Sequence, residues 1–295
     1  MSKEERCSLS WFMDAFGTEE SCRSYLMAKR WPDGFVCPKC GAKHGYSLSS
    51  RHQIQCADCR YQASLTAGTV MHRSHLPLAK WFLAFYLVAQ DKRGISAVQL
   101  SKQLDVTYKT AWYLLRRVRK AMGQRDGSHM LSGIVEFDDT YFGGPTTGKK
   151  RGRGTEKTKV FVALSLVDKG NPQFLKMKVT QNLKKASVKK FANAQIEKGS
   201  TVRADGFRSY PPALSEDYAL ETQPYNPKAA PLHWLHTIVG NAKAFILGTY
   251  HGLPRKNLQS YLDEFCFRFS RRFFNGHLFE RLAVAVALSS ADSKG

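Results

Sequence analysis

Residues 135–144 read VEFDDTYFGG, a run of apolar and β-branched residues that is interrupted by acids and stopped by two glycines. The run predicts a β-strand that carries carboxylates. Alternation along a strand places Phe137 and Asp139 on one face and Glu136 and Asp138 on the other. At least one acid should therefore point into an interior or a cleft, where an ionised carboxylate requires a cation. The alternative is an edge strand whose acids are solvated, and the rest of the chain distinguishes the two.

The overall charge points to a polyanionic partner. Lys and Arg outnumber Asp and Glu by 45 to 24 in 295 residues, which gives a formal net charge of +21. Nucleic acid is the expected partner, because no continuous apolar run reaches membrane-spanning length. The first residues lack the basic and then apolar pattern of a signal peptide, so we expect a cytoplasmic, nucleoid-associated protein. The seven cysteines are then interpreted as metal ligands or thiols in a reducing compartment.

A short helical segment over residues 1–34 precedes a predicted zinc ribbon at residues 35–72. Two C-x-x-C pairs, fifteen residues apart, provide the ligand pattern: Cys37 with Cys40 and Cys56 with Cys59. His44 and His52 could compete as ligands, but four thiolates already complete a tetrahedral site. A closed four-thiolate site leaves no open position for chemistry, so the zinc is expected to be structural.

Helical periodicity over residues 73–125 predicts a helix-turn-helix DNA-binding domain. Gly94 breaks the first helix, Ser96 can cap the second, and a turn at 105–107 leads into a third helix with a basic face. Its N-terminal end would enter a major groove of double-stranded DNA. The alternative is a helical hairpin that only packs. The expected DNA-contacting residues are Thr107, Tyr108, Lys109, Thr110 and Arg116.

A basic, glycine-containing segment follows the carboxylate-bearing strand at residues 145–159. Such a segment cannot bury itself, and it should contact phosphates. A solvated run of charges is the equally weighted alternative on composition alone. The expected phosphate contacts are Lys149, Lys150, Arg151 and Arg153.

Residues 133–290 are expected to form an α/β catalytic domain with a mixed five-stranded sheet and flanking helices. The predicted order of elements is βββαβαβα, the order of an RNase H-like domain. Asp205 follows the fourth strand, and the last helix of the series spans about residues 233–247. In this topology the first strand, the end of the fourth strand and the last helix converge on one cleft, which receives Asp138 and Asp205.

The chain resembles bacterial insertion-sequence transposases of the DDE type that carry an N-terminal zinc ribbon. The resemblance covers nearly the whole chain and rests on blocks in the family's order, including RWPDGFVCPKCG, ISAVQLSKQLDVTYKTAW, VEFDDTYFGG, RADGFRSY and LGTYHGLPRKNLQSYLDEFCFRF. It implies metal-dependent strand cleavage at insertion-sequence ends and strand transfer into target DNA. It also implies that Asp138 and Asp205 are the first two catalytic acids, holding two Mg²⁺ or Mn²⁺ ions. Phosphodiester displacement by two hard cations agrees with this interpretation.

The third ligand departs from the pattern of many relatives, because residues 232–250 contain no Glu. In DDE enzymes this ligand precedes a basic residue by seven positions, two helical turns on one face. His236 and Lys243 have that spacing, so we expect His236 as the ligand and Lys243 as a phosphate contact. Members of this family are described by a motif with Asn in this place, so Asn241 remains the alternative. His233 is a weaker choice.

Two other functions are kept as alternatives: a non-enzymatic regulator that binds DNA through the ribbon and the helix-turn-helix, and an RNase H-like nuclease that hydrolyses and never joins. The expected partners of the transposase are terminal inverted repeats and target DNA. A homodimer or higher oligomer is expected on DNA. Asp139 could replace Asp138 if the strand register shifts by one residue, but the family block favours Asp138. Glu136 is expected to be a solvated acid, with an auxiliary role as the alternative.

Overall fold

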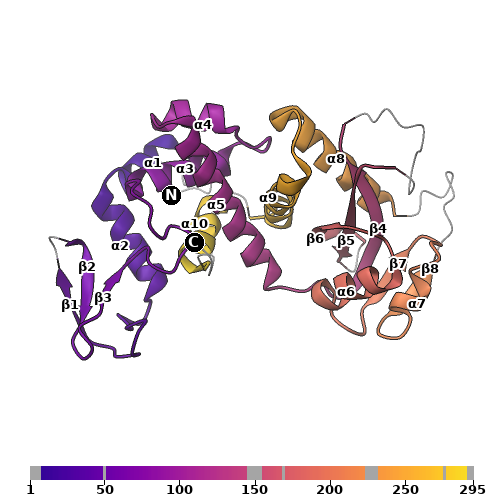
Figure 1. Cartoon of the computed structure of the whole chain (residues 1–295), viewed down its shortest axis with the longest axis horizontal. Helices are drawn as coiled ribbons and strands as arrows, with labels where there is room; N and C mark the ends of the chain where they lie inside the picture. The colour runs from indigo at the N-terminus through magenta and orange to yellow at the C-terminus, as the bar shows by residue number, and fades with distance from the viewer. Residues whose placement is uncertain are drawn as a thin grey trace. The chain divides into compact units, whose positions relative to one another are not determined.

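The structure is a computed structural model of the whole chain, and it describes residues 8–48, 51–144, 155–167, 170–222, 232–274 and 277–290. The chain divides into two compact units (Figure 1). The first unit comprises residues 1–124 and 274–295, and the second comprises residues 125–273. Among the described residues, every helix is too short or too polar to cross a lipid bilayer.

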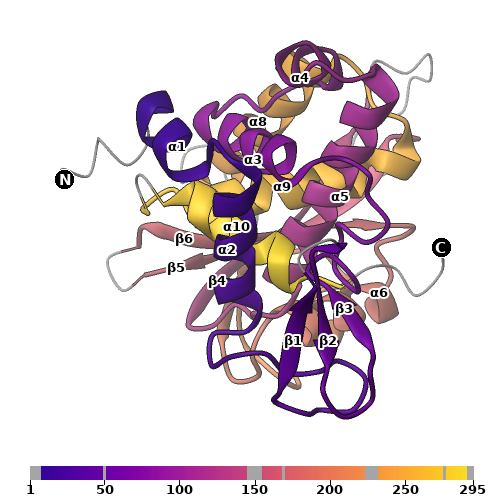
Figure 2. The ribbon, with the colours of Figure 1, turned by 90° about the vertical axis from the view of Figure 1, so that its left-hand side faces the viewer.

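The first unit contains a three-stranded antiparallel sheet in the order β1 (Gly45–Leu48), β2 (Gln53–Cys56), β3 (Gln62–Ser64). Figure 2 shows the three strands together near the end of α2 (Glu19–Arg30). Phe35, Ile54 and Ala63 form a small core between them. The Arg30 guanidinium at the end of α2 donates to the Ser64 carbonyl at 3.0 Å, which fastens the sheet to the helix. So small a core requires a further stabilising element, such as a bound metal.

The helices of the first unit are α1 (Leu9–Phe16), α2, α3 (Leu78–Gln90), α4 (Ala97–Leu104) and α5 (Tyr108–Gly127). The residues before α1 and α2 cap them through hydroxyl groups, because Ser8 accepts from Trp11 N and Thr18 accepts from Ser21 N. Ser96 caps α4 in the predicted way, accepting from Gln99 N at 3.1 Å. Asp105 then adopts the left-handed conformation that ends α4 and begins the turn into α5.

The C-terminal helix α10 (Leu278–Leu288) also belongs to the first unit. Its Phe279 ring lies 5.0 Å from the Phe16 ring and 6.2 Å from the Phe82 ring, centroid to centroid. The expected extent of the catalytic domain, residues 133–290, therefore differs from the extent of the second unit, residues 125–273. The reason is aromatic packing, which joins α10 to α1 and α3.

The second unit contains a five-stranded mixed sheet in the order β6-β5-β4-β7-β8. Its strands are β4 (Ile134–Phe142), β5 (Thr158–Leu166), β6 (Pro172–Thr180), β7 (Thr201–Ala204) and β8 (Ala219–Thr222). The first three strands are antiparallel neighbours, whereas β7 pairs in parallel with both β4 and β8. This is the strand order of an RNase H-like fold, and it confirms the predicted fold class.

Helices cover both faces of this sheet, and each face has its own core. Buried residues of α6 (Lys185–Gln195) and α7 (Pro211–Leu214) pack with Val135 and Phe137 on one face. Those of α8 (His233–Tyr250) and α9 (Leu258–Ser270) pack with Val162 and Leu175 on the other. A 3-10 turn at Arg255–Asn257 leads into α9. Strand β4 lies in the middle of the sheet, which explains why its apolar residues are buried on both sides.

Candidate active site

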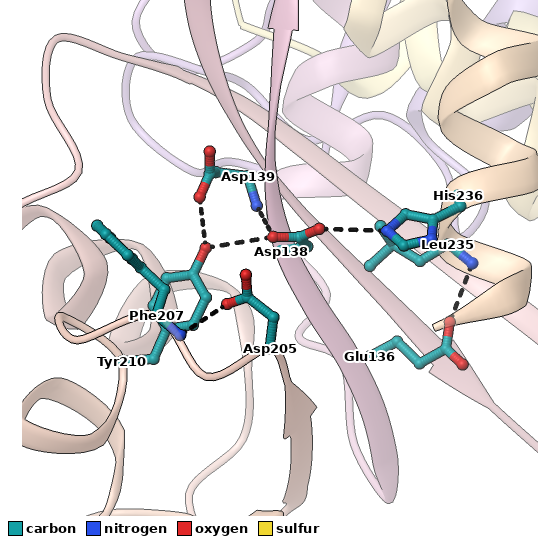
Figure 3. A network of polar contacts seen from close by, with 8 residues as sticks. All are labelled: Glu136, Asp138, Asp139, Asp205, Phe207, Tyr210, Leu235 and His236. Atoms are coloured by element: carbon teal, nitrogen blue, oxygen red, sulfur yellow. Dashed lines mark hydrogen bonds and ion pairs between the residues drawn. The ribbon is translucent and has the colours of Figure 1, made fainter. Parts of the chain in front are cut away.

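The parallel register of β4 and β7 brings Asp138 and Asp205 to the same level of the sheet. Ile134 pairs with Thr201, and the pairing continues in step as far as Phe137 with Ala204. One further step along each strand places Asp138 beside Asp205, which directly follows β7. Residues paired across parallel strands project to the same face, so the two carboxylates lie next to each other (Figure 3). A backbone amide holds Asp205 in place, because Phe207 N donates to its Oδ1 at 3.0 Å.

Helix α8 delivers His236 to this point, where its Nε2 lies 3.4 Å from Oδ2 of Asp138. Burial raises the pKa of Asp138 above its ordinary value, and the Asp205 and Asp139 carboxylates add to this, whereas His236 opposes it. The hydrogen bond with Asp138 in turn raises the pKa of His236. The site thus combines a buried acid, a neighbouring acid and an imidazole, an arrangement that is typical of functional sites.

Asp139 is directed elsewhere, because its Oδ1 accepts a hydrogen bond of 2.8 Å from the Tyr210 hydroxyl. Tyr210 lies in the core between β4 and α6, and it is fully buried. Its hydroxyl is also 3.5 Å from Oδ1 of Asp138. Asp138, by contrast, is on the face of β4 that α8 covers. The geometry therefore favours Asp138 over Asp139 as the acid that faces His236.

Glu136 lies two residues before Asp138 on the same face, and it is only 7% exposed. Its Oε2 accepts a hydrogen bond of 3.0 Å from Leu235 N in the first turn of α8. Burial raises the pKa of Glu136, and the bond from Leu235 opposes this. Of the two positions considered for Glu136, the solvated one is wrong, because β4 is a central strand and α8 covers this face.

Lys243 lies two turns after His236, on the same side of α8 at 100° per residue. Its ammonium group is 5.9 Å from the ring centroid of Phe142, at the end of β4. Partial burial lowers the pKa of Lys243, and the ammonium group of Lys157 adds to this. Asn241 is exposed and lies about 140° around the helix from His236. The structure thus brings His236 to Asp138 and places Asn241 on a different side of α8.

The donor set suits hard or borderline divalent cations. Carboxylate oxygens suit Mg²⁺ and Mn²⁺, and an imidazole favours the transition metal of the two. The mutual repulsion of Asp138, Asp139 and Asp205, which contributes to the raised pKa of Asp138, is what a cation would relieve. In the part of the chain that the structure describes, these side chains do not converge as tightly as the cysteines of the ribbon do.

The four ribbon cysteines form a ready tetrahedral site. The Sγ atoms of Cys37 and Cys59 are 3.6 Å apart, as are those of Cys40 and Cys56, and all four lie within 4.8 Å of one another. Zinc–sulfur bonds of about 2.3 Å in a tetrahedron imply sulfur separations of about 3.8 Å. The Cys37 carbonyl accepts from Gly41 N at 2.9 Å, and Gly41 has φ +77°, which forms the first knuckle. The thiolate set fits a structural zinc ion.

The residues expected to contact DNA lie at the start of α5. Tyr108 is 57% exposed, and Lys109 and Arg116 are also exposed. Thr107 and Thr110 first stabilise the helix itself, because Thr107 Oγ1 accepts from Thr110 N at 3.2 Å and lies 3.0 Å from Thr110 Oγ1. The basic face of this helix is not uniform, since Arg119 is buried. The expected phosphate contacts Lys149, Lys150, Arg151 and Arg153 lie outside the described residues.

Tyr210 was not predicted as a site residue, and Lys157 was predicted only as part of the basic segment at residues 145–159. Tyr210 ends the RADGFRSY block, which is notable for Asp205. Lys157 lies in the basic segment after β4, which is notable for its charge. A tyrosine five residues after a candidate acid carries no chemical signature of its own, because tyrosines are commonly buried in cores. Only the folded contact between its hydroxyl and Asp139 distinguishes it.

The sequence of the chain matches two families of transposase domains. Residues 130–270 match the ISXO2-like transposase domain, and residues 17–62 match the transposase zinc-ribbon domain. A protein of Halobacterium salinarum, described as an uncharacterized protein in transposable element ISH50, is 32% identical over 223 residues. These residues cover 69% of this chain and 72% of that protein.

Two solved structures show weaker likeness. The Mos1 strand transfer complex is 15% identical with a TM-score of 0.29, over 72% of this chain and 79% of that chain. A pre-cleavage Mos1 transpososome is 12% identical with a TM-score of 0.25, over 71% and 80% respectively. The family therefore rests on the sequence matches, and these agree with the strand order and the four-cysteine site. The chain belongs to the insertion-sequence transposases that combine a transposase zinc ribbon with an ISXO2-like transposase domain.

Proposed function

We propose that this transposase cleaves DNA strands at the ends of an insertion sequence and joins them to target DNA, with Asp138, Asp205 and His236 as the metal-binding centre. The observation that carries the proposal is the β4–β7 register, which sets Asp138 level with Asp205 on the face to which α8 brings His236. Carboxylates from two strands and an imidazole from one helix provide three separate points of attachment for divalent cations.

In phosphoryl transfer, some residues of the chain would bind the metal ions, others would bind the DNA backbone, and others would fix the acids in place. Bound Mg²⁺ or Mn²⁺ ions would activate the attacking water or 3′-hydroxyl and stabilise the leaving oxygen. Partial burial lowers the pKa of Lys243 and the charge of Lys157 lowers it further, because the two ammonium groups repel each other. Together they would bind a phosphate of the DNA backbone beside the centre. The Tyr210 hydroxyl lies 2.8 Å from Asp139 and 3.5 Å from Asp138, which helps to fix both acids, and the Phe207 amide holds Asp205. Such fixed positions are what preorganised electrostatic catalysis requires.

The proposed partners are terminal repeats and target DNA. The exposed residues at the start of α5, Tyr108 and Lys109, support sequence-specific contact by a helix-turn-helix. The net charge of +21 supports tight, salt-dependent contact with phosphates. Assembly as a dimer or higher oligomer on two DNA ends is part of the proposal.

The test uses purified protein, DNA that carries both ends of the element, and Mg²⁺ or Mn²⁺. Asp138→Asn and Asp205→Asn are expected to abolish cleavage and joining while DNA binding survives, because each removes a charge at the centre and keeps the side-chain shape. Asp217→Asn is a matched control in the same unit, since Asp217 pairs with Lys198 at 2.9 Å. It is expected to cleave normally.

The same assay separates the alternatives. Full activity of Asp138→Asn and Asp205→Asn would refute the assigned centre. Binding of the ends without cleavage by the wild type in either metal would favour the DNA-binding regulator. A supplied 3′-hydroxyl end distinguishes the transposase from a hydrolytic nuclease, because only the transposase yields joined product.

A further inference from the structure

Among the described helices that begin without a capping side chain of their own, α8 and α3 are capped by a glutamate that is distant in the sequence. Helix α8 is preceded by Leu232, which has φ +59° and provides no side-chain hydrogen bond, and Glu136 accepts from Leu235 N. Helix α3 is preceded by Pro77, and Glu19 accepts from Leu78 N and Ala79 N at 2.9 and 3.0 Å. A carboxylate at this end of a helix satisfies free amides and interacts favourably with the helix dipole.

Burial of the Glu136 carboxylate in the sheet is unfavourable in free energy. It is 7% exposed in the middle of a central strand, and its neighbour on the same face, Ile134, is apolar and packs against the core beneath α8. A buried carboxylate costs several kcal/mol unless it is paired. An aliphatic side chain would satisfy the packing, so the hydrogen-bond acceptor at this position requires another explanation.

The explanation lies in the spacing of two contacts (Figure 3). Glu136 and Asp138 are alternate residues on one face of β4, and Leu235 and His236 are consecutive residues of α8. Glu136 meets the Leu235 amide at 3.0 Å, and Asp138 meets the His236 imidazole at 3.4 Å. The strand thus fixes both the start of the helix and the side chain that the helix carries.

We propose that Glu136 is a positioning residue for His236, a role that rests on the function proposed above. By capping α8, Glu136 prevents its first turn from fraying, and so keeps the imidazole in reach of Asp138 and of ions shared with it. A misplacement of about 1 Å at a reacting centre can cost about 100-fold in rate, so a cap on Leu235, the residue before His236, should affect the chemistry. Glu136 acts through α8 and need not touch the DNA.

The test compares Glu136→Gln, which keeps an oxygen acceptor without the charge, with Glu136→Leu, which keeps the bulk and removes the acceptor. Three quantities are measured on the full chain: hydrogen exchange at the start of α8, binding of Mn²⁺ alone followed by electron paramagnetic resonance, and the Mn²⁺ concentration for half-maximal DNA cleavage. Glu136→Leu is expected to exchange about tenfold faster at residues 233–237, as loss of a cap worth about 1 kcal/mol or more implies. It should also require about tenfold more Mn²⁺, and Glu136→Gln should recover most of both losses.

Glu19→Leu provides the matched control, because it removes the equivalent cap from α3 in the first unit. It should accelerate exchange at the start of α3 and leave the Mn²⁺ requirement unchanged. The proposal is refuted if Glu136→Leu leaves exchange in α8 unchanged, or if Glu136→Gln is as defective as Glu136→Leu, which would indicate a direct need for the charge. An equal shift in the Mn²⁺ requirement for Glu19→Leu would also refute it.

The exchange measurement is independent of DNA chemistry. If Asp138→Asn cleaved normally, the proposed function would fail while the cap could still be demonstrated. If Asp138→Asn is inactive and Glu136→Leu behaves as the wild type in all three measurements, only the positioning role fails.

Discussion

The Tyr210 hydroxyl donates a hydrogen bond of 2.8 Å to Oδ1 of Asp139, the acid adjacent to Asp138 in β4. Burial and the neighbouring carboxylates raise the pKa of Tyr210 far above its ordinary value, so the phenol remains a donor at any working pH. Asp139 is thereby held toward the core that contains Tyr210, and Asp138 is left to face α8.

Removal of this donor should impair the centre without unfolding the unit. Tyr210→Phe keeps the ring that packs edge-to-face on Phe137 at 4.9 Å, but it withdraws a hydrogen bond from Asp139. We expect a loss of stability of about 1–3 kcal/mol and a cleavage rate about tenfold lower. Thermal unfolding and a single-turnover cleavage assay measure the two effects. Wild-type cleavage by the Phe variant would show that the orientation of Asp139 does not matter.

The identity of the third ligand is decided by substitution and metal exchange. His236→Ala should lose cleavage in both metals, whereas Asn241→Ala should retain it, because His236 is 3.4 Å from Asp138 and Asn241 is on another side of α8. His236→Glu should favour Mg²⁺ over Mn²⁺ relative to the wild type, since carboxylates suit hard cations better than imidazole does. Retained activity in His236→Ala together with collapse in Asn241→Ala would transfer the role to Asn241.

Zinc removal should unfold the ribbon selectively. The core of Phe35, Ile54 and Ala63 is too small to persist alone, so Cys37→Ser, or a chelator, should abolish protection of β1–β3 from hydrogen exchange. The five-stranded sheet of the second unit should keep its protection, which is the internal control. A protein that contains less than one zinc per chain when fully folded would contradict the assignment.

Two basic groups should contribute differently to DNA binding. Neutralising Lys149, Lys150, Arg151 and Arg153 should weaken binding to all sequences and flatten its salt dependence by up to about four units of slope. Lys109→Ala should instead reduce the discrimination between terminal repeats and random DNA, because it lies where a helix would enter a major groove. Titrations of both DNAs at several salt concentrations measure these effects. Equal discrimination in Lys109→Ala and the wild type would count against the helix-turn-helix.

The free energy of unfolding should depend on pH through Asp263, a buried acid outside the active centre. Burial raises the pKa of Asp263 to about 6, against the opposing effects of Gln259 and Lys178. An acid whose pKa is raised by folding binds more protons in the folded state, so stability falls as pH rises from about 4 to 6. Asp263→Asn keeps the acceptor for Gln259, which donates to Asp263 Oδ1 at 2.7 Å. It should be more stable than the wild type by about 2–3 kcal/mol at pH 7.5, with no difference below about pH 4.

Asp217 provides a control, because folding lowers its pKa, whereas folding raises the pKa of Asp263. The hydrogen bond from Lys198 lowers the pKa of Asp217, so this group contributes stability above its unfolded pKa, and the contribution is lost as pH falls through the folded pKa. Asp217→Asn should therefore be less stable than the wild type at pH 7.5. Chemical denaturation of both variants across the pH range measures the two trends, and a stabilising effect of Asp217→Asn would contradict this assignment.

Local patterns in the sequence were sufficient for the elements and for the zinc site. Cysteine spacing fixes the knuckles, because two thiolates separated by two residues reach one ion from a single turn, and the four Sγ atoms do converge. Alternation predicts β4, and the order of elements predicts the neighbours of β4, because that order is typical of an RNase H-like domain. Asp138, in the middle of β4, meets Asp205, just after β7, because the two parallel strands pair in step.

Only the tertiary structure decided what holds Asp139, what holds the helix, and where the last helix packs. The position of Asp139 depends on Tyr210, whose hydroxyl reaches Asp139 across 71 residues of sequence. The cap from Glu136 to Leu235 spans 99 residues, and Phe279 meets Phe16 from the far end of the chain. Periodicity along a segment shows which of its faces is buried, but the partner of that face is set by long-range packing, which no local pattern encodes.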